Sequence, residues 1–311
     1  MRSAFASTKL KTQIWPDFIA HFKSETTKAS YQSDVDEIMD YIEKDFLDIE
    51  EEDADRYFRW MKDKIKKGGL HSSTLSKKCR ELHSLAEFIC ENREKYEMSV
   101  NFQDTYAKYL PYVSKQEKQA KSVPVKDIDR LLHVTRNDIM AYCMIVFMYR
   151  AGLSSTELCN LKTDDFVIYE NGMFATVKGR REMCYIPKDL ETVLYQYLKD
   201  RERKLIKMEK NCTFLFFNKR GNPLNTMYIS RLLKKYTDRA GVPNYSAQSI
   251  RNTCAFTMAS YGATGAQTAK QLGITTTQIA RYNGMAYRDN YGQKSANDLV
   301  HIHVLPPDET K

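Results

Sequence analysis

Apolar residues recur at helical spacing through most of the first half of the chain. One stretch covers residues 31–47. A second covers residues 53–65 and ends at two lysines and two glycines, which together form a helix stop signal. A third covers residues 72–89 and opens on two serines, which favour a helix N-cap. We therefore predict that the first half is built from helices alone.

The second half combines helices with a short region of alternating residues. Helical spacing returns at residues 125–133 and 139–149 and again, further on, at residues 225–239. Between residues 166 and 186, β-branched and aromatic residues form three short segments, over residues 166–170, 173–178 and 183–186. The first two are separated by Asn171–Gly172, a strong hairpin signal. We predict a mainly α protein with a small antiparallel β-hairpin sheet in its second half.

Composition excludes several classes of protein. The chain has 311 residues, 42% apolar and 28% charged, as expected of a globular protein with two domains. Its longest apolar run, residues 139–149, is too short to span a bilayer, and no secretory signal is visible at the start. The seven cysteines contain no Cys-x-x-Cys pair and the six histidines are dispersed, so we expect neither disulfides nor a metal site. Nucleotide-binding and hydrolase motifs are missing, so no cofactor is expected.

Charge is distributed unevenly along the chain. Residues 1–112 contain 18 basic and 21 acidic side chains, whereas residues 113–311 contain 30 and 19. A basic half predicts a polyanionic partner such as nucleic acid. Residues 113–123 are polar and rich in lysine, a composition typical of a linker. We therefore predict a helical domain over residues 1–112, a basic linker over 113–123 and a second domain over 124–311.

Four segments of the second half occur in the order and spacing of one known family. They are Ala151–Leu161, Val177–Pro187, Gln248–Thr253 and Leu272–Ile274. The first resembles the Thr-Gly-Leu-Arg-x-Ser-Glu-Leu-x-x-Leu box of the tyrosine recombinases, or phage integrases. The second is similar to their Gly-Lys-Gly-x-Lys-x-Arg hairpin, the third to their His-x-Leu-Arg-His-Thr box and the fourth to their Leu-Gly-His motif. The resemblance covers nearly the whole chain.

The resemblance implies a C-shaped clamp of two domains around duplex DNA, with a SAM-like core-binding domain in the first half. In this family two arginines hold the scissile phosphate, a lysine and histidines transfer protons, and a tyrosine attacks phosphorus. Here the first arginine is replaced by Ser154, and two histidine positions hold Gln248 and Ile274. Among these positions, only Lys178 and Arg251 match the family.

Spacing leaves the position of the nucleophile open. Counted from Ile274 without gaps, Tyr282 lies about one residue short of the family's tyrosine. When Thr276–Ile279 is matched to the family's Thr-Thr-Gln-Ile-Tyr, Ala280 takes that position instead. Tyr287 and Tyr291 lie further away, so Tyr282 is the nearest candidate by spacing.

The altered positions bear on function. Losing a single donor to the developing charge slows a reaction by about 10²–10³-fold, and three positions differ here. We therefore expect no catalytic residues and no enzymatic activity. The expected function is sequence-specific binding of double-stranded DNA by an inactive recombinase scaffold, most naturally as a (pro)phage transcriptional repressor. An active divergent integrase and an architectural DNA-bridging protein are the alternatives.

The residues expected to contact DNA are basic or polar and come from the first-half helices, the linker, the hairpin and two later helices. They are Lys28, Lys77, Lys78, Arg80, Lys115, Lys118, Lys121, Lys178, Arg180, Arg181, Asn225, Thr226, Tyr228, Arg231, Lys234, Lys235 and Arg251. Besides DNA, a second copy of the chain and a protein or peptide antagonist are expected partners, and a membrane is not. The expected location is the cytoplasm, in association with the nucleoid.

Overall fold

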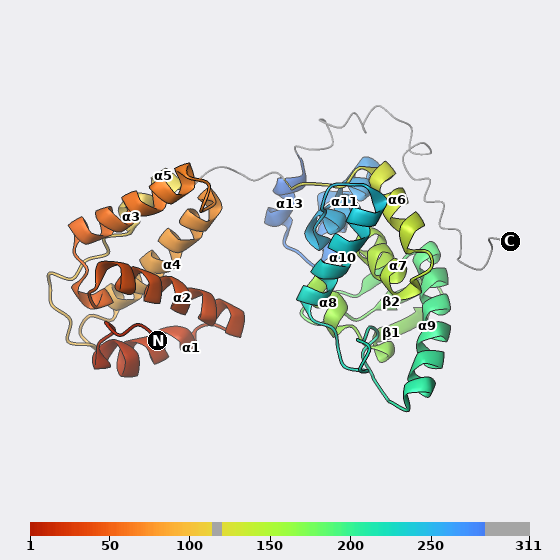
Figure 1. Cartoon of the computed structure of the whole chain (residues 1–311), viewed down its shortest axis with the longest axis horizontal. Coiled ribbons are helices and arrows are strands. Elements are labelled where there is room, and N and C mark those ends of the chain that lie inside the picture. Colours follow the sequence, from red (N-terminus) through yellow and green to blue (C-terminus); the bar gives the residue numbers. More distant parts are fainter. Residues whose placement is uncertain (114–119, 284–311) are drawn as a thin grey trace. The chain divides into compact units, whose positions relative to one another are not determined.

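The structure is a computed structural model, and it describes residues 1–113 and 120–283 (Figure 1). The chain divides into two compact units, Met1–Gln116 and Glu117–Lys311. Each unit has its own cluster of buried apolar side chains.

In its described residues, the first unit contains helices and no strand, as the apolar spacing predicts. Its elements are η1 (Leu10–Ile14), α1 (Trp15–Ala20), α2 (Glu25–Ile42), η2 (Phe46–Asp48), α3 (Glu51–Lys66), α4 (Ser72–Glu91), η3 (Ala107–Tyr109) and α5 (Leu110–Val113). Helices α2, α3 and α4 supply most of the core, with Ile38, Met61 and Leu82 almost fully buried. Burying these amphipathic faces against one another removes their apolar surface from water.

Helix α2 is displaced from the predicted stretch of residues 31–47. It starts earlier because the Ser24 hydroxyl accepts a hydrogen bond from the Thr27 amide and caps the helix. It ends at Ile42 because Glu43 adopts a left-handed conformation, with φ of 62°. Phe46, the next apolar residue of the pattern, lies outside α2. Its side chain is buried, but it belongs to the short η2 turn.

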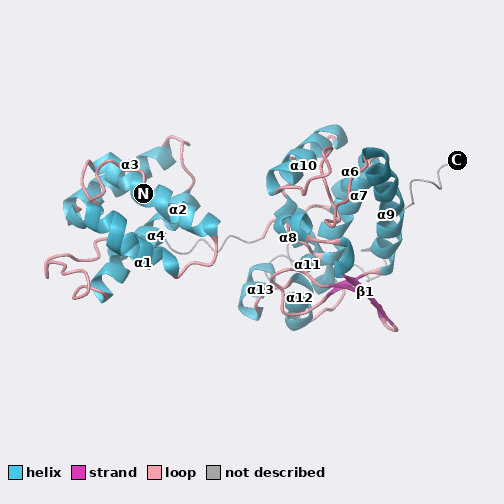
Figure 2. Cartoon of the chain, turned by 90° about the horizontal axis from the view of Figure 1, so that it is seen from below, coloured by secondary structure: helices cyan, strands magenta, loops and turns pink. Residues whose placement is uncertain are grey.

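The second unit combines helices with a small sheet that lies at one edge of the unit in Figure 2, which confirms the predicted fold class. Its helices are α6 (Val125–Thr135), α7 (Ile139–Val146), η4 (Phe147–Ala151), α8 (Ser155–Asn160), η5 (Thr163–Asp165), α9 (Lys188–Met208), α10 (Thr226–Ala240), α11 (Ala247–Ser260), α12 (Gly265–Leu272) and α13 (Thr276–Asn283). The strands are β1 (Phe166–Tyr169), β2 (Gly172–Ala175) and β3 (Cys184–Ile186). They form an antiparallel sheet in the order β1-β2-β3, with Phe174 opposite both Val167 and Tyr185.

The strands are shorter than predicted. Strand β2 ends at Ala175, whereas the sequence pattern continued to residue 178. The Arg180 amide donates to the Val177 carbonyl at 3.0 Å, and Gly179 has a positive φ of 89°. The backbone therefore turns at residues 177–180, before strand β3 begins at Cys184.

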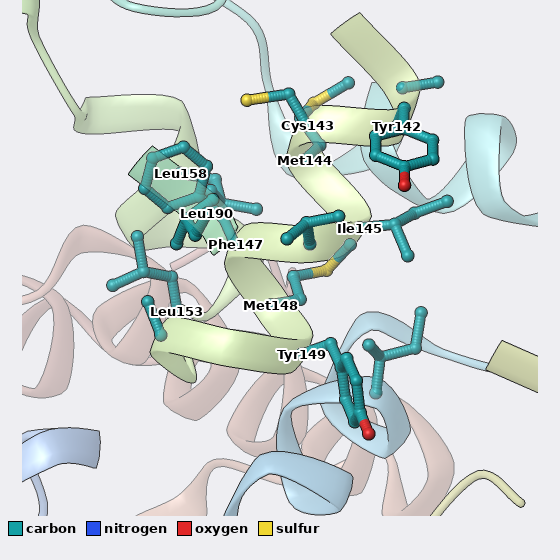
Figure 3. Close-up of a cluster of buried hydrophobic side chains, with 14 of the residues drawn as sticks. Tyr142, Cys143, Met144, Ile145, Phe147, Met148, Tyr149, Leu153, Leu158 and Leu190 are labelled. Atoms are coloured by element: carbon teal, nitrogen blue, oxygen red, sulfur yellow. The ribbon is translucent and has the colours of Figure 1, made fainter. Parts of the chain in front are cut away.

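A continuous apolar helix, α7 followed by η4, forms the centre of the second unit. Its residues from Ala141 to Tyr149 are all nearly inaccessible, and Figure 3 shows their side chains radiating in several directions. A helix that is apolar all round is stable only when other elements cover every face. Gly152 ends it with φ of 64°, and a Cβ there would lie 2.4 Å from Leu272 Cδ2. This close approach brings the first box against the end of α12.

Candidate active site and nucleic-acid interface

One carboxylate, that of Glu157, joins two guanidinium groups in the second unit. Arg180 donates to it through Nε at 2.6 Å and Nη2 at 2.9 Å, and Arg251 donates through Nη1 at 3.0 Å. The side chains of Arg180 and Arg251 are only 2% and 9% exposed. Because one carboxylate offsets one of the two cations, these three residues form a cationic centre with a net positive charge.

Local helix chemistry fixes the position of Glu157. Ser154 is the N-cap of α8: its hydroxyl accepts from the Glu157 amide, and the Glu157 carboxylate accepts from the Ser154 amide at 2.7 Å. This reciprocal pair is a capping box. Ser154, at the position of the family's first arginine, therefore supports the helix start and the carboxylate rather than offering a cation.

The C-terminal end of α12 completes the surroundings of the cationic centre. Arg251 Nη2 donates to the Leu272 carbonyl at 2.6 Å, and Arg180 Nη1 donates to the Gln271 carbonyl. The carbonyls of a last helical turn lack partners within the helix and carry partial negative charge. Both positively charged guanidinium groups therefore donate to carbonyls that carry partial negative charge.

On the pKa values of Glu157 and Arg251, burial and the oppositely charged partner have opposite effects. Burial alone would raise the pKa of Glu157, but the hydrogen bond and charge of Arg180, together with the charge of Arg251, outweigh it and lower that pKa. Burial lowers the pKa of Arg251, and Glu157 partly compensates. An arginine stays protonated under such shifts, so the centre remains charged.

A tyrosine hydroxyl lies close to this centre. Tyr282, on α13, is 4% exposed, and its hydroxyl donates to Asn252 Oδ1 at 3.2 Å. Asn252 follows Arg251 on α11, and Gln248 Nε2 donates to the same oxygen at 2.8 Å. Tyr282 also acts on the pKa of Arg251, after the larger effects of burial, Glu157 and Arg180. The structure thus brings Tyr282 and Gln248 together around Asn252.

The other positions that were matched to the family contribute differently from the cationic centre. Lys178 is exposed in the turn between β2 and β3, two residues before Arg180. Ile274 is half-buried and packs on the apolar cluster that includes Tyr282. Ala280 lies within α13 and carries no nucleophilic group, while Tyr287 and Tyr291 lie outside the described residues.

Two residues of the site, Glu157 and Asn252, were missed by reasoning from the sequence. Both lie inside the boxes used for the resemblance: Glu157 is the glutamate of the first box, and Asn252 replaces the final histidine of the third segment. Comparing every polar position of each box, rather than the catalytic ones alone, would have found them.

The expected DNA-contacting residues of the second unit are mostly exposed. On α10 the apolar residues Ile229, Leu232, Leu233 and Tyr236 are buried. The expected DNA contacts there face solvent or are half-buried: Asn225, Thr226, Tyr228, Arg231, Lys234 and Lys235. Arg181 and Lys121 are exposed as well, whereas Lys115 and Lys118 lie outside the described residues. Arg180 differs, because its side chain points inward to Glu157 and not to the surface of the hairpin turn.

In the first unit, several expected DNA contacts are paired within the protein. Lys78 is buried and contacts Asp34 at 2.7 Å and Glu37 at 3.1 Å, and Lys77 contacts Asp34 at 2.8 Å. Lys28 pairs with Glu25, and Arg80 is exposed. The acidic face of α2 therefore meets the lysines of α4.

Two further findings concern what the described residues contain. Over residues 1–113 and 120–283, no group of histidine, cysteine and carboxylate side chains is arranged to hold a metal ion. In the same ranges, no helix has both the length and the apolar character needed to cross a membrane.

Gly273 permits the close packing of Arg180, which leads to a prediction. Its φ is 64°, and an added Cβ would lie 2.6 Å from Arg180 Cγ and Cδ. We expect Gly273→Ala to lower the free energy of unfolding by about 2–4 kcal/mol, from left-handed strain plus overpacking. Gly241→Ala is the matched control, because φ is 62° there with nothing within 4 Å. Urea denaturation measures both variants, and equal losses would contradict the role given to Arg180 packing.

Several known proteins resemble this chain in sequence or in fold. Tyrosine recombinase XerC of Bacillus licheniformis is 28% identical over 227 residues, covering 68% of this chain and 70% of that protein. Tyrosine recombinase XerC of a Roseiflexus species is 22% identical over 316 residues, covering 94% and 97%. The crystal structure of XerH site-specific recombinase bound to palindromic difH substrate, a post-cleavage complex, superposes with a TM-score of 0.69 at 15% identity, covering 94% and 90%.

These relatives correct two expectations drawn from the sequence. The chain was expected to be a repressor and not an enzyme, because three family positions are altered. Its relatives are named recombinases, which points to a DNA-cleaving and joining enzyme and overturns both expectations. The physical reason is that a cation can reach the site from another segment of the chain. Residue 154 carries no guanidinium, yet Arg180 brings a second guanidinium to Glu157.

The family itself is identified by the second unit. The model of the phage integrase family matches residues 121–287, which is more than half of the chain and includes all four segments noted in the sequence. It also spans the cationic centre and Tyr282. The chain therefore belongs to the phage integrase family.

Proposed function

We propose that this protein is a site-specific recombinase that cuts and rejoins double-stranded DNA. One observation carries the proposal: the buried hydroxyl of Tyr282 is held by Asn252, the residue that follows Arg251 of the cationic centre. A nucleophile beside fixed positive charge suits phosphoryl transfer, in which positioning and charge stabilisation supply most of the catalysis. The relatives named as tyrosine recombinases support the same activity.

Arg251 is the proposed ligand of the scissile phosphate. A guanidinium has five N–H groups, and those of Arg251 donate to Glu157 and Leu272, which leaves others for phosphate oxygens. Its charge would oppose the negative charge that develops on phosphorus during attack. Because Arg251 is largely buried, water competes only weakly with it for the phosphate. The electrostatic attraction between Arg251 and the phosphate is therefore stronger than it would be in water.

Tyr282 is the proposed nucleophile and Lys178 the proposed proton donor. The Tyr282 oxygen would form a bond to phosphorus while the bond from phosphorus to the 5′ oxygen breaks. The tyrosine proton passes to water, and Lys178 protonates the leaving oxygen. Rejoining reverses the step, so the chemical energy of the broken DNA bond is retained in the protein–DNA bond and no external energy source is needed.

The wider DNA interface is also part of the proposal. The exposed polar residues of α10, together with Arg181 and Lys121, would contact the DNA backbone and bases. Residues 1–112 would act as the core-binding domain and residues 113–123 as the basic linker. The crystal structure of a lambda integrase fragment is a dimer bound to a core site, which supports assembly of this chain as a homo-oligomer on DNA. Association with the nucleoid would follow.

The test is to trap the covalent intermediate. The binding site in the native genome is mapped first, and a duplex carrying that site is nicked so that cleavage releases a short fragment and cannot be reversed. We expect a protein–DNA adduct that survives a denaturing gel, and peptide mapping should place the DNA on Tyr282. A chain that binds this duplex tightly, yet gives no adduct over many hours, would refute the proposal.

A further inference from the structure

Arg180 reaches the cationic centre from a segment that the first box does not contain. It stands in the turn after β2, and its guanidinium donates to Glu157, to the Gln271 carbonyl and to the Gly152 carbonyl at 3.2 Å. Gly152 is two residues before Ser154, and Ser154 bonds the same carboxylate. The Arg180 head group therefore lies beside the backbone position from which an arginine at residue 154 would extend.

We infer that Arg180 is a positioning residue that replaces the missing first-box arginine and holds Glu157 so that Arg251 faces the DNA phosphate. This inference rests on the proposed function, because it concerns how that phosphate is bound. The two parallel bonds from Arg180 Nε and Nη2 engage both oxygens of the Glu157 carboxylate. Such a bidentate pair fixes the orientation of the carboxylate as well as its position. Arg251 then donates to an oxygen that cannot rotate away.

Charge balance supports the same role. Without Arg180, the carboxylate of Glu157 would cancel the charge of Arg251, and the pair would attract a phosphate weakly. With Arg180 present, the three residues keep a net positive charge. Ser154 cannot supply that charge, since its hydroxyl is neutral and already engaged in the helix cap. Arg180 thus restores both the orientation and the charge that the altered box lacks.

Burial distinguishes this role from direct phosphate binding. The Arg180 side chain is 2% exposed, and four hydrogen bonds occupy most of its five N–H groups. Arg251, in contrast, donates two bonds to protein acceptors in the described part of the chain. Arg180 therefore acts through Glu157 and Arg251. A lysine could not do the same, because a single ammonium cannot span a carboxylate and two carbonyls in a planar fork.

The experiment uses the full chain and the nicked duplex described above, at saturating protein, and measures the rate of adduct formation in a single turnover. We expect Arg180→Lys to slow adduct formation by about 10²-fold, since misplacing a reacting group by about 1 Å costs that much. The slope of log affinity against log salt should fall by about 0.9, the effect of one lost phosphate contact. Arg203→Ala, an exposed arginine of α9, is the control and should stay within about twofold.

A second variant restores the guanidinium from the family's own position. Arg180→Ala should be at least as slow as Arg180→Lys, and Ser154→Arg in the Arg180→Ala background should recover the rate to within about tenfold of wild type. Circular dichroism establishes which variants fold. If the alanine variants do not fold, the rate and the salt slope of Arg180→Lys alone test the inference. A folded Arg180→Lys protein with wild-type rate and salt slope would overturn the inference. So would a folded double variant no faster than Arg180→Ala.

The two failures can be told apart. If wild type itself forms no adduct, the proposed function fails, and the salt slope of Arg180→Lys still tests the positioning role. If wild type forms the adduct while Arg180→Lys is unchanged in both rate and slope, the recombinase proposal stands and only the role of Arg180 is refuted.

Discussion

Replacing Tyr282 by phenylalanine should abolish the covalent protein–DNA adduct while the protein still binds its DNA site. Removing the nucleophile of an enzyme that works through a covalent intermediate costs about 10⁶-fold in rate, which places the variant below detection. The fold should survive, because phenylalanine keeps the edge-on ring contact with Phe256 at 5.5 Å. The hydrogen bond to Asn252 is lost, at a cost of about 1 kcal/mol.

The measurement is a time course of adduct formation beside a binding titration on the same duplex. Tyr195→Phe is the control, since Tyr195 is an exposed tyrosine of α9 and loses the same hydroxyl. It should form adduct at the wild-type rate. An adduct that persists in Tyr282→Phe would show that another tyrosine attacks the DNA, and peptide mapping would then locate it.

Glu157→Ala should be among the most destabilising substitutions in the second unit. It leaves the guanidinium groups of Arg180 and Arg251 buried without their shared carboxylate. Removing one partner of a buried ion pair costs about 3–5 kcal/mol. Loss of the α8 capping box with Ser154 adds about 1 kcal/mol. Chemical denaturation of the full chain measures the effect, and Glu202→Ala, an exposed glutamate of α9, should change stability by less than about 0.5 kcal/mol.

The same carboxylate predicts how stability depends on pH. The pKa of Glu157 is lower in the folded protein than in the unfolded chain, so its contribution is present when the pH is well above about 4. That contribution is lost as the pH falls and the folded-state carboxylate is protonated. Glu157→Gln should therefore lose stability at neutral pH and approach wild type in acid. A constant difference between the two proteins across this range would contradict the pairing.

Local sequence patterns predict the helices well because helix formation depends on neighbours three and four residues away. The central apolar helix after Asp138 and the amphipathic α10 both lie where the spacing predicts them. The start of α2 was misplaced because its first turn is set by the Ser24 cap, where apolar spacing carries little information. The fold class could therefore be predicted from the sequence, whereas element ends depended on single caps.

The direction of charged side chains could not be predicted in the same way. Arg180 and Lys78 both occur in basic stretches and were expected on the surface, yet each turns inward to carboxylates far away in the chain. Nothing in the residues beside Arg180 encodes its contact with Gln271, which depends on how α12 packs. For the same reason, counting altered family positions predicted the wrong function, because it ignored groups that reach the site from other segments.

The distribution of the cationic centre along the chain has a consequence for biosynthesis. Glu157 lies 94 positions before Arg251, and two of the carbonyls that accept from the guanidinium groups, those of Gln271 and Leu272, come later still. During translation the centre therefore cannot assemble until α12 has left the ribosome, although α8 and the hairpin turn emerge long before. The proposed nucleophile Tyr282 lies later again, on α13, so the proposed DNA cleavage would be confined to molecules that have folded through α13.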